Sequence, residues 1–582
     1  MPTAELPNSE DASECEARAS ELYKSGNIGS AIEIYEARVR THPEDLAASR
    51  SLARRLAESR QFPRAEAAIS EALALFGADT VLLALLVFVK QEQGLSEQAR
   101  DIAAHAALHY PASLSFQFDS RLLLPMVYTD KADLLAHRQR FETGLAELEA
   151  MLPSLQQDAT QIHTLARSNF LLAYQGENDL SLQRRYASIL GSMIDAADPA
   201  LRARQQPEQP AQIDSPRSTA SGKIRVGFVG KWFYACTAGN YFERWITHLD
   251  ASRFERFVYY TGQTDDAVTA RIGAAADHFV RLQGDAHSNA QRIRADALDI
   301  LIYPEVGMST GSYLLANCRL ARTQCAAWGH PVTTGSSMID VYFSCRAMEP
   351  ADYQTHYSER VVLFDGIGVD FALPGLAAIG SRADFGLPAA ARLYFCPQSL
   401  FKIHPDMDAA FVDILERDHT AVLVFFQADS RAITMAFADR LTGALAIRDV
   451  RAKGQVKFLP RLSQHAFRQA LRLADVILDP FHWSGGGTSL DAFAGDVPVV
   501  TLPGRFMRGR QTAAMLRMMN ADALIAANVE AYVNTAIDIA GNPSLNHDLR
   551  TLISANKQAL FDRHDLTDNF SRALLQLVND RG

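Results

Sequence analysis

The pattern of hydrophobic and polar residues is helical at first and repeats along the chain. Over residues 12–115, small and apolar residues recur every 34 positions, which is the tetratricopeptide period. Small residues at fixed points let the helices of neighbouring hairpins pack closely, so we predict two or three tetratricopeptide-like repeats. A helical hairpin array without repeat ancestry is the alternative. The equivalent positions are Ala31, Ala65 and Ala99; Ala19, Ala53 and Val87; Gly26 and Gly94; and, two periods apart, Pro43 and Pro111, with Arg60 where the middle repeat should have glycine.

The next segment stays helical but leaves this period. Residues 116–202 are predicted as an additional helical region, in which 132–151 has apolar residues at helical spacing. Residues 203–222 contain three prolines, several serines and almost nothing apolar. This composition predicts a linker or an extended surface strap.

From residue 224 the pattern changes to short apolar runs that alternate with helical stretches. Repeated strand–helix units predict parallel sheets covered on both faces, here as two Rossmann-like lobes at 223–380 and 381–582. The stretch 267–297 is predicted to be helical, as is the C-terminal stretch 544–578. The predicted strands contain the runs IRVGFVG, FERFVYYTG, LDILIY, QCAAW, IDVYFS, ARLYF, AVLVFF, QVKFL, ADVIL and VPVVT.

A glycine loop follows the buried run 476–478. Gly485, Gly486 and Gly487 precede a predicted helix that opens at Thr488, and Thr488 with Asp491 fits a capping box. Glycines let backbone N–H groups approach an anion, and a helix start favours negative charge. A plain turn without a ligand is the alternative, because a glycine loop alone is a weak motif.

Several other loops fall at predicted strand carboxyl ends, where ligands bind in open parallel sheets. Lys402 follows a strand directly and could meet a phosphate as a point charge, although a lone lysine is often a solvated surface residue. Arg461 and Leu462 follow the run KFLP and could offer backbone groups to a base edge. These loops are the residues 230–239, Glu305, Gly329–Gly335, Gln398–Lys402, Pro460–Leu462 and Ser484–Thr488.

Composition narrows the class of protein. The chain has 582 residues and a formal net charge of −10, which favours neither a nucleic acid nor an anionic membrane as the main partner. No apolar run is long enough to cross a bilayer, and the N-terminus lacks a signal-peptide pattern, so we expect a cytoplasmic protein. The six cysteines form no CxxC pair, which indicates free thiols in a reducing compartment and not a zinc site.

Four motifs in the two lobes carry a family resemblance. In chain order they are WGHPVTTGSSMIDVYFS, CPQSLFKIHPDMDAAFVDIL, KFLPRLSQHAFRQALRLADVILD and SGGGTSLDAFAGDVPVVTLPG. Together they resemble the O-GlcNAc transferase and SPINDLY-type glycosyltransferases over roughly residues 224–575, with the helical repeats in front as in that family. The resemblance implies the GT-B fold, an inverting reaction and a nucleotide sugar as donor, most often UDP-GlcNAc, with UDP-glucose and GDP-fucose used by relatives.

The resemblance also implies roles for particular residues. Lys402 would stabilise the leaving diphosphate. Apart from the resemblance, an inverting step needs a general base near the acceptor group, and Glu305 and His330 are the candidates. Cys236, Thr333 and Thr334 are candidates to face the acceptor or donor cleft. The predicted donor-binding residues are Gln398, Ser399, Lys402, Arg461, Leu462, Gly485, Gly486, Gly487, Thr488, Ser489 and Asp491.

Two positions depart from the family pattern. Cys236 stands where the family usually carries a histidine that faces the donor, and Gly486 and Gly487 stand where the animal enzymes have a loop histidine before two threonines. A thiol does not replace an imidazole as acid or base. Glu305 is then the best remaining carboxylate for the cleft, with a role as a loop cap as the alternative.

Three hypotheses follow from the sequence. The first is a metal-independent glycosyltransferase without a cofactor, which acts on a Ser/Thr or Asn side chain of a protein that the repeats present; no DxD-like motif stands at a matching strand end. The second is a donor-binding relative with weakened catalysis. The third is a repeat scaffold with structural lobes, against which the lysine loop and the glycine loop argue together.

Overall fold

The computed structural model describes residues 12–24, 27–165, 167–203, 222–376 and 378–580. The predicted repeat glycine Gly26 and residues 204–221 of the predicted linker lie outside these residues. The chain divides into two compact units, Met1–Met126 with Gln139–Ala150, and Val127–Arg138 with Met151–Gly582. The first unit contains helices alone among its described residues, and the second combines helices with parallel sheets.

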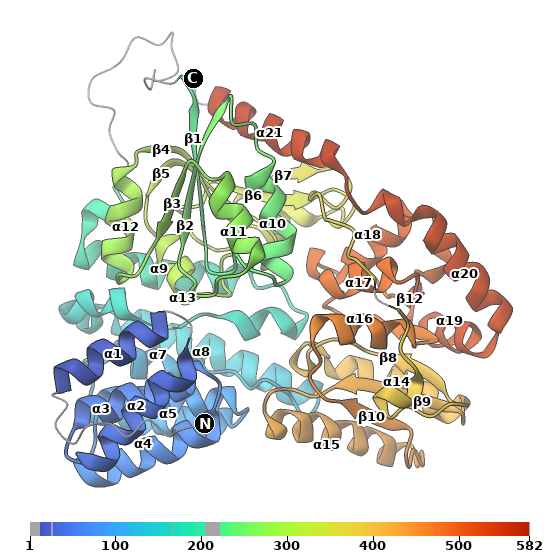
Figure 1. The fold of residues 1–582 in the computed structure, drawn as a ribbon, viewed down its shortest axis with the longest axis horizontal. Coiled ribbons are helices and arrows are strands. Elements are labelled where there is room, and N and C mark those ends of the chain that lie inside the picture. Colours follow the sequence, from blue (N-terminus) through green and yellow to red (C-terminus); the bar gives the residue numbers. More distant parts are fainter. Residues whose placement is uncertain (1–11, 25–26, 166, 204–221, 377, 581–582) are drawn as a thin grey trace. The chain divides into compact units, whose positions relative to one another are not determined.

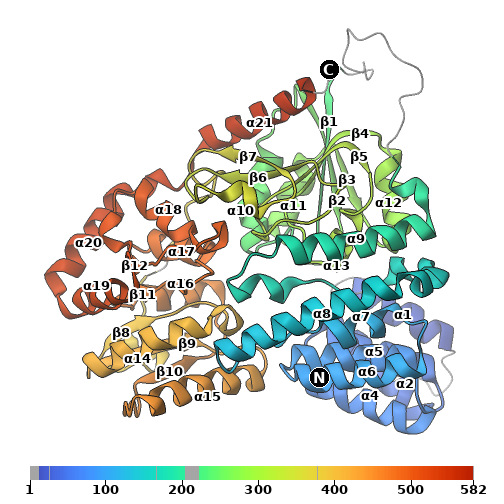
Figure 2. The ribbon, with the colours of Figure 1, turned by 180° about the vertical axis from the view of Figure 1, so that it is seen from behind.

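The first unit is made of antiparallel helix pairs, drawn in blue in Figure 2. Equivalent helices begin at Ala12, Leu46, Thr80 and Leu114, which keeps the predicted 34-residue period. The repeated alanines are fully buried between helices, as expected for positions that allow close packing. The helices are α1 (Ala12–Lys24), α2 (Ile28–Thr41), α3 (Leu46–Glu58), α4 (Phe62–Phe76), α5 (Thr80–Glu92), α6 (Ser96–His109) and α7 (Leu114–Leu122), and the long α8 (Lys131–Leu155) follows.

The turns inside two of these hairpins share one strained backbone conformation. Gly94 has φ 81°, and Arg60, its equivalent in the middle repeat, has φ 60°. A residue with a Cβ costs about 1–2 kcal/mol in this region. Arg60 makes a 3.5 Å ion pair with Glu92 at the surface, and such pairs contribute little.

We therefore expect Arg60→Gly to raise the free energy of unfolding of the repeat unit by about 1 kcal/mol, because glycine adopts positive φ without strain. The reverse change in the neighbouring repeat, Gly94→Arg, should lower it by a similar amount. Urea unfolding followed by circular dichroism at 222 nm measures both. Equal midpoints for Gly94→Arg and the wild type would contradict the prediction.

The second unit contains two parallel sheets, each with helices on both faces (Figure 1). The sheet of the first lobe has seven strands in the order β3-β2-β1-β4-β5-β6-β7, and the sheet of the second lobe has five in the order β10-β9-β8-β11-β12. The strands of the first lobe are β1 (Ile224–Gly230), β2 (Phe254–Tyr260), β3 (His278–Arg281), β4 (Leu298–Tyr303), β5 (Ala321–Ala326), β6 (Val341–Cys345) and β7 (Arg360–Phe364). Those of the second are β8 (Arg392–Phe395), β9 (Ala421–Phe426), β10 (Val456–Leu459), β11 (Val476–Leu478) and β12 (Val499–Val500).

Helices connect these strands and complete the two Rossmann-like lobes. The helices before and within the first lobe are α9 (Leu180–Ala197), α10 (Thr237–Thr247), α11 (Ala267–Ala275), α12 (Ala286–Ala295) and α13 (Thr310–Leu315). Those that follow are α14 (Asp408–Arg417), α15 (Arg431–Ile447), α16 (Gln464–Arg472), α17 (Gly487–Ala494), α18 (Gln511–Met518), α19 (Val529–Gly541), α20 (Pro543–Asn556) and α21 (His564–Asn579).

The prediction of one helical stretch over 267–297 was wrong. The edge strand β3 separates α11 from α12 within this stretch and pairs in parallel with β2. β3 has only four residues, none of them buried, so it lacks the apolar run that marks the central strands. β7, at the opposite edge, was not predicted either, because its first four residues are not fully buried.

The helix α21 lies far along the chain from the lobe on which it packs. Although it falls within the range predicted for the second lobe, it contacts β4, β7 and α10 of the first. Its Phe570 ring stacks on Trp245 of α10 with a centroid distance of 4.1 Å and also contacts Phe228 of β1. The chain therefore passes between the lobes twice, once after β7 and once before α21.

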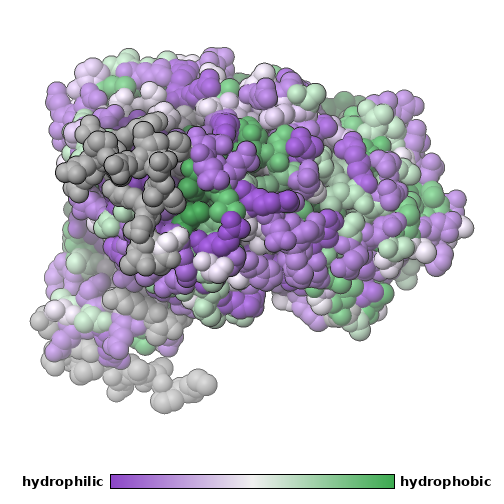
Figure 3. Space-filling model, turned by 90° about the horizontal axis from the view of Figure 1, so that it is seen from above, coloured by the Kyte–Doolittle hydropathy of each residue, from purple (hydrophilic) through white to green (hydrophobic). Residues whose placement is uncertain are grey.

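Polar side chains cover most of the face of the protein shown in Figure 3, with hydrophobic residues in smaller patches between them. This distribution agrees with a composition in which 21% of residues are charged. Among the described residues, no helix combines the length and the hydrophobicity needed to cross a membrane.

Candidate functional site

The order of the strands reverses at one point in each sheet, and the predicted site residues follow the strands at these points. In the second lobe β8 and β11 are neighbours, although two strands separate them in sequence. In the first lobe the same holds for β1 and β4. Parallel sheets bind ligands at such switch points, outside the carboxyl ends of the strands.

At the switch point of the second lobe, the lysine loop and the glycine loop meet. Gln398, after β8, donates a hydrogen bond from Nε2 to the Thr488 hydroxyl at 2.6 Å. Both segments line one small cavity between the strand ends. Its walls are Pro397, Gln398, Ile477, Leu478, Asp479, Pro480, Thr488 and Ser489.

Asp479, which sequence analysis missed, organises the glycine loop. Its carboxylate accepts hydrogen bonds from the Gly485 amide at 2.7 Å, the Ser484 hydroxyl at 2.8 Å and the Thr501 hydroxyl at 2.6 Å. A Cβ at Gly485 would lie 2.2 Å from the Ser489 hydroxyl oxygen and 2.8 Å from that of Thr488, so a side chain there would displace both hydroxyl groups. An aspartate directly after an apolar run was the sequence signal that could have identified Asp479, which is buried in the structure.

The predicted capping box of α17 was wrong. The helix begins at Gly487, its N-cap is Gly486, and no side chain caps its first turn. Thr488 binds Gln398, and Asp491 accepts a 2.7 Å hydrogen bond from Arg468 of α16. The amides at the start of α17 are therefore not satisfied by a capping side chain, which leaves a helix N-terminus suited to an anion.

Lys402 lies among aromatic rings, one of which, Trp483, belongs to the segment that leads into the glycine loop. Its ammonium nitrogen is 5.6 Å from the centroid of the Trp483 ring and 5.9 Å from that of Phe401, and Tyr174 packs against both rings. Burial lowers the pKa of Lys402 to about 8. No carboxylate in the described part of the chain forms an ion pair with Lys402, so its charge is available to a bound anion.

In the first lobe, Cys236 and Glu305 occupy the two sides of the switch point. Cys236 is the N-cap of α10 after β1, and its thiol donates to the Trp232 carbonyl at 3.4 Å. Burial raises the pKa of Cys236 to about 11, so it is a neutral thiol. The next residue, Thr237, would lie 3.1 Å from a Cβ at Gly487, which brings the start of α10 against the glycine loop.

Glu305 and His330 follow the adjacent strands β4 and β5 and are both buried. Glu305 accepts hydrogen bonds from the Ser312 hydroxyl at 2.9 Å and the Met308 amide at 3.2 Å, and burial raises its pKa to about 8. Burial lowers the pKa of His330 to about 3, with smaller effects of Arg508 and Lys402. Glu305 is thus largely protonated at neutral pH, whereas His330 is neutral.

His330 is the group that links the first lobe to Lys402. Its ring lies 6.2 Å from that of Trp483, which also contacts Lys402, and 5.5 Å from Phe170. Its Nε2 has no hydrogen-bond partner within the described residues. The structure therefore places a neutral imidazole with an unused nitrogen on the aromatic cluster around Lys402.

Thr333 and Thr334, predicted to face the cleft, bind a carboxylate of their own lobe. The Thr333 hydroxyl and the Thr334 amide donate to Glu359 at 2.7 and 2.8 Å, and the Thr334 hydroxyl also donates to it. Gly335 then adopts φ 69° against the backbone of Gln183. These bonds fix the loop after β5 to Glu359, directly before β7, and Gly335 lies against α9.

The remaining predicted donor-binding residues lie at the edge of the site. Ser399 is exposed, and its carbonyl accepts the Lys402 amide at 2.8 Å. Arg461 is exposed after β10 and pairs with Asp429, and Leu462 beside it is partly buried. The Ser489 hydroxyl is bonded to Thr512 at 2.7 Å. The structure therefore groups Gln398, Lys402, Thr488 and the glycines, and leaves Ser399 and Arg461 exposed.

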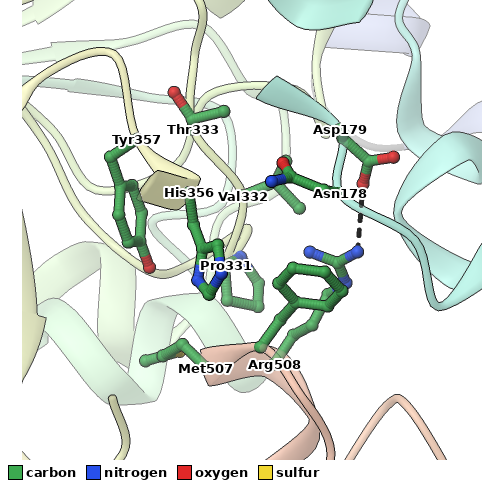
Figure 4. A pocket seen from close by; sticks show the side chains of 10 residues that line it. Asn178, Asp179, Pro331, Val332, Thr333, His356, Tyr357, Met507 and Arg508 are labelled. Atoms are coloured by element: carbon green, nitrogen blue, oxygen red, sulfur yellow. Dashed lines mark hydrogen bonds and ion pairs between the residues drawn. The ribbon is translucent and has the colours of Figure 1, made fainter. Parts of the chain in front are cut away.

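A second pocket lies beside the loop after β5 (Figure 4). In it, the buried Arg508 pairs with Asp179 at 3.1 Å and donates to the Glu177 carbonyl. Thr333 is the only predicted site residue in its wall. The lining residues are Asn178, Asp179, Pro331, Val332, Thr333, His356, Tyr357, Phe506, Met507 and Arg508.

Two groups of side chains in the described chain have metal-ligand composition. They are His248, Asp370 and His564, and His404, Asp406 and His482. In each group a protein cation already pairs with the carboxylate, Arg244 with Asp370 at 2.5 Å and Lys131 with Asp406 at 3.2 Å. We therefore assign neither group to a metal.

Two Rossmann-like lobes with their site residues at facing switch points, preceded by repeated helix pairs, define a GT-B protein with a helical-repeat region. A solved structure of a mutant Thermobaculum terrenum O-GlcNAc transferase has the same fold, with a TM-score of 0.70, 19% identity and 98% of both chains covered. The chain belongs to glycosyl transferase family 41, whose family profile matches residues 205–366 and 370–570.

Named relatives agree with this assignment. The Arabidopsis thaliana protein named "Probable UDP-N-acetylglucosamine--peptide N-acetylglucosaminyltransferase SEC" is 25% identical over 64% of this chain and 38% of its own length. The Arabidopsis thaliana protein with the same enzyme name followed by SPINDLY is 25% identical over 56% of this chain and 36% of its own length. The Oryza sativa protein with the SPINDLY name is 26% identical over 62% of this chain and 39% of its own length. The chain thus spans less than half the length of these relatives.

Proposed function

We propose that the protein transfers a sugar from a UDP-sugar, UDP-GlcNAc or a UDP-hexose, to a Ser/Thr or Asn side chain of a protein, with inversion at the sugar carbon. One observation carries this proposal: Lys402, which has no ion pair within the described residues, lies 5.6 Å from the ring of Trp483 in the segment that leads into the glycine loop and the uncapped start of α17 at the β8/β11 switch point. An ammonium group and a helix N-terminus are the charges needed to stabilise a leaving nucleoside diphosphate. The membership in family 41 supports the same chemistry.

The residues of the second lobe would stabilise the leaving group. As the bond between the sugar carbon and the phosphate oxygen breaks, negative charge grows on the diphosphate. Lys402, the amides of Gly486 and Gly487 and the Thr488 hydroxyl would stabilise this charge, so the step needs no metal ion. Gln398 holds the Thr488 side chain in place through its 2.6 Å hydrogen bond.

A base in the first lobe would accept the proton of the acceptor. The acceptor oxygen or nitrogen attacks the sugar carbon from the face opposite the diphosphate, and its proton passes to the base. His330 offers an unpaired Nε2, and a bound diphosphate would raise its low pKa by neutralising Lys402. Glu305 is the second candidate, although both of its oxygens already accept hydrogen bonds.

Cys236 favours a second candidate function, a relative that binds the donor but transfers the sugar slowly. The thiol stands where the family usually has a histidine, and its raised pKa makes it a poor base. In both functions the helical repeats would bind the acceptor or partner protein.

A screen with purified protein and a panel of UDP- and GDP-sugars tests the proposal. The expected result is thermal stabilisation by UDP of about 2.7 kcal/mol at 100 times its dissociation constant, and release of UDP that rises when acceptor proteins are added. Stabilisation without release would favour the weakened relative. Neither stabilisation nor release with any donor would overturn both functions and leave the scaffold.

A further inference from the structure

One buried polar group in the described chain faces the glycine loop from the opposite lobe. Tyr241 of α10 is 4% exposed, and its hydroxyl has no hydrogen-bond partner within the described residues. Its ring is held by an edge contact with Phe371 at 5.4 Å. A buried polar group without a partner costs about 1–3 kcal/mol, so such groups often mark the position of a ligand.

The hydroxyl occupies the space that a side chain at Gly486 would need. A Cβ at Gly486 would lie 2.9 Å from the Tyr241 hydroxyl oxygen and 3.1 Å from Oε1 of Gln511. Gly486 stands in the region where the animal O-GlcNAc transferases carry a histidine. In this chain the position is a glycine, and the phenol of Tyr241, from α10 of the other lobe, lies where a side chain would begin.

The surroundings of this hydroxyl favour an anion. Two helices that lack a side-chain hydrogen bond at their N-caps, α10 and α17, begin close together, since Thr237 of α10 would contact a Cβ at Gly487. Their dipoles both present positive ends to this point. Asp491, a carboxylate close enough to act on the Tyr241 hydroxyl, is paired with Arg468. Burial raises the pKa of Tyr241 well above its ordinary value, so the phenol keeps its proton and can donate it in a hydrogen bond.

We propose that the Tyr241 hydroxyl donates a hydrogen bond to the diphosphate of the donor bound at the glycine loop, in place of the side chain absent at Gly486. This inference rests on the proposed function, because it assumes a nucleoside diphosphate at the loop. The Tyr241 hydroxyl would give the diphosphate one hydrogen bond from the first lobe, whereas the other proposed contacts to the diphosphate come from the second lobe. Only a chain with glycine at position 486 has room for this contact.

Binding of UDP and of uridine to the purified full chain, measured by calorimetry, tests the inference. Tyr241→Phe should weaken UDP binding about 10-fold or more, because a hydrogen bond to a charged oxygen is lost. Uridine, which has no phosphate, should bind as tightly as to the wild type. The melting temperature of the free variant should stay equal or rise, because the unpaired hydroxyl has been removed.

Tyr259→Phe is the matched control. Tyr259 is a buried tyrosine of β2 whose hydroxyl donates to Asp296 at 2.6 Å, so its loss should lower the melting temperature and leave the affinity for UDP unchanged. In the double variant Tyr241→Phe/Gly486→His, the loop histidine should recover most of the lost affinity. The single variant Gly486→His should bind UDP poorly, because the histidine meets the Tyr241 hydroxyl.

The outcomes separate this inference from the proposed function. Wild-type protein that binds UDP, together with an unchanged affinity in Tyr241→Phe, would overturn the inference alone. An equal loss of UDP and uridine affinity would also overturn it, since the role would then be structural. Wild-type protein that binds neither UDP nor a UDP-sugar would overturn both.

Discussion

Lys402→Ala is expected to lower kcat for UDP release by about 10²–10³-fold, the effect of removing one group that stabilises charge developing in a transition state. The loss should be greater in kcat than in the affinity for the donor, because negative charge on the diphosphate grows as the glycosidic bond breaks. Lys453, an exposed lysine in a turn of the same lobe, supplies the control Lys453→Ala, which should keep full activity. Initial rates of UDP release at saturating donor measure both variants. Equal rates for Lys402→Ala and the wild type would contradict the proposed role.

The pKa of Lys402, lowered by burial to about 8, adds a pH dependence to the same prediction. The lysine is charged below this pKa and neutral above it, so kcat/KM should fall as pH rises through about 8. A bound diphosphate favours the charged form, which should move the fall in kcat itself to higher pH. Arginine stays charged throughout this range, so any activity left in Lys402→Arg should lack the fall. A wild-type profile that is flat from pH 7 to 9.5 would argue against a titrating Lys402.

Gly335→Ala is expected to have the largest effect on stability, a loss of more than about 3 kcal/mol. Gly335 has φ 69°, and a Cβ there would lie 2.3 Å from the backbone carbonyl carbon of Gln183 and 2.6 Å from the amide nitrogen of Arg184. These are backbone atoms of α9, so the clash can be relieved only by moving the helix or the loop. Thermal unfolding followed by differential scanning calorimetry measures the loss.

Two other glycines separate the causes of this loss. Gly386 has φ 63° but open space around a Cβ, so Gly386→Ala should cost about 1–2 kcal/mol from the backbone alone. Gly443 in α15 has neither constraint, and Gly443→Ala should stabilise by about 0.5–1 kcal/mol. If Gly335→Ala cost no more than Gly386→Ala, the close contact with α9 would not matter for stability.

Elements with a clear pattern of apolar residues, either the 34-residue repeat or a continuous apolar run, were predicted from the sequence. Elements without such a pattern were missed. The repeats were found because their alanines must be small, and the central strands because they are buried on both faces. β3 and β7 lie at sheet edges and are partly exposed, so their residues lack a continuous apolar run. The capping box failed because Thr488 and Asp491 have partners outside α17, Gln398 and Arg468, which a local motif cannot reveal.

The candidate site residues that the sequence could indicate lie in loops whose own residues, a lysine or a run of glycines, are suited to binding an anion. Lys402 and the glycines Gly485–Gly487 belong to such loops, and the strand order brings these loops together as expected. For Tyr241 the sequence carries no such signal, and for Asp479 it shows only a carboxylate after an apolar run. Their importance depends on atoms distant in sequence: Tyr241 faces Gly486 across two lobes, and Asp479 binds Thr501 of the next strand. Residue type alone identifies neither.

The position of α21 has a consequence for the order in which the protein folds during its synthesis. The core of the first lobe includes Trp245 stacked on Phe570, so this lobe still exposes apolar surface after all of its strands have left the ribosome. It must remain incomplete while the whole second lobe is translated. The second lobe can fold before the first is finished, and chains interrupted near the end should collect as species with one finished and one open lobe. Such chains are natural clients for chaperones that bind exposed aromatic residues.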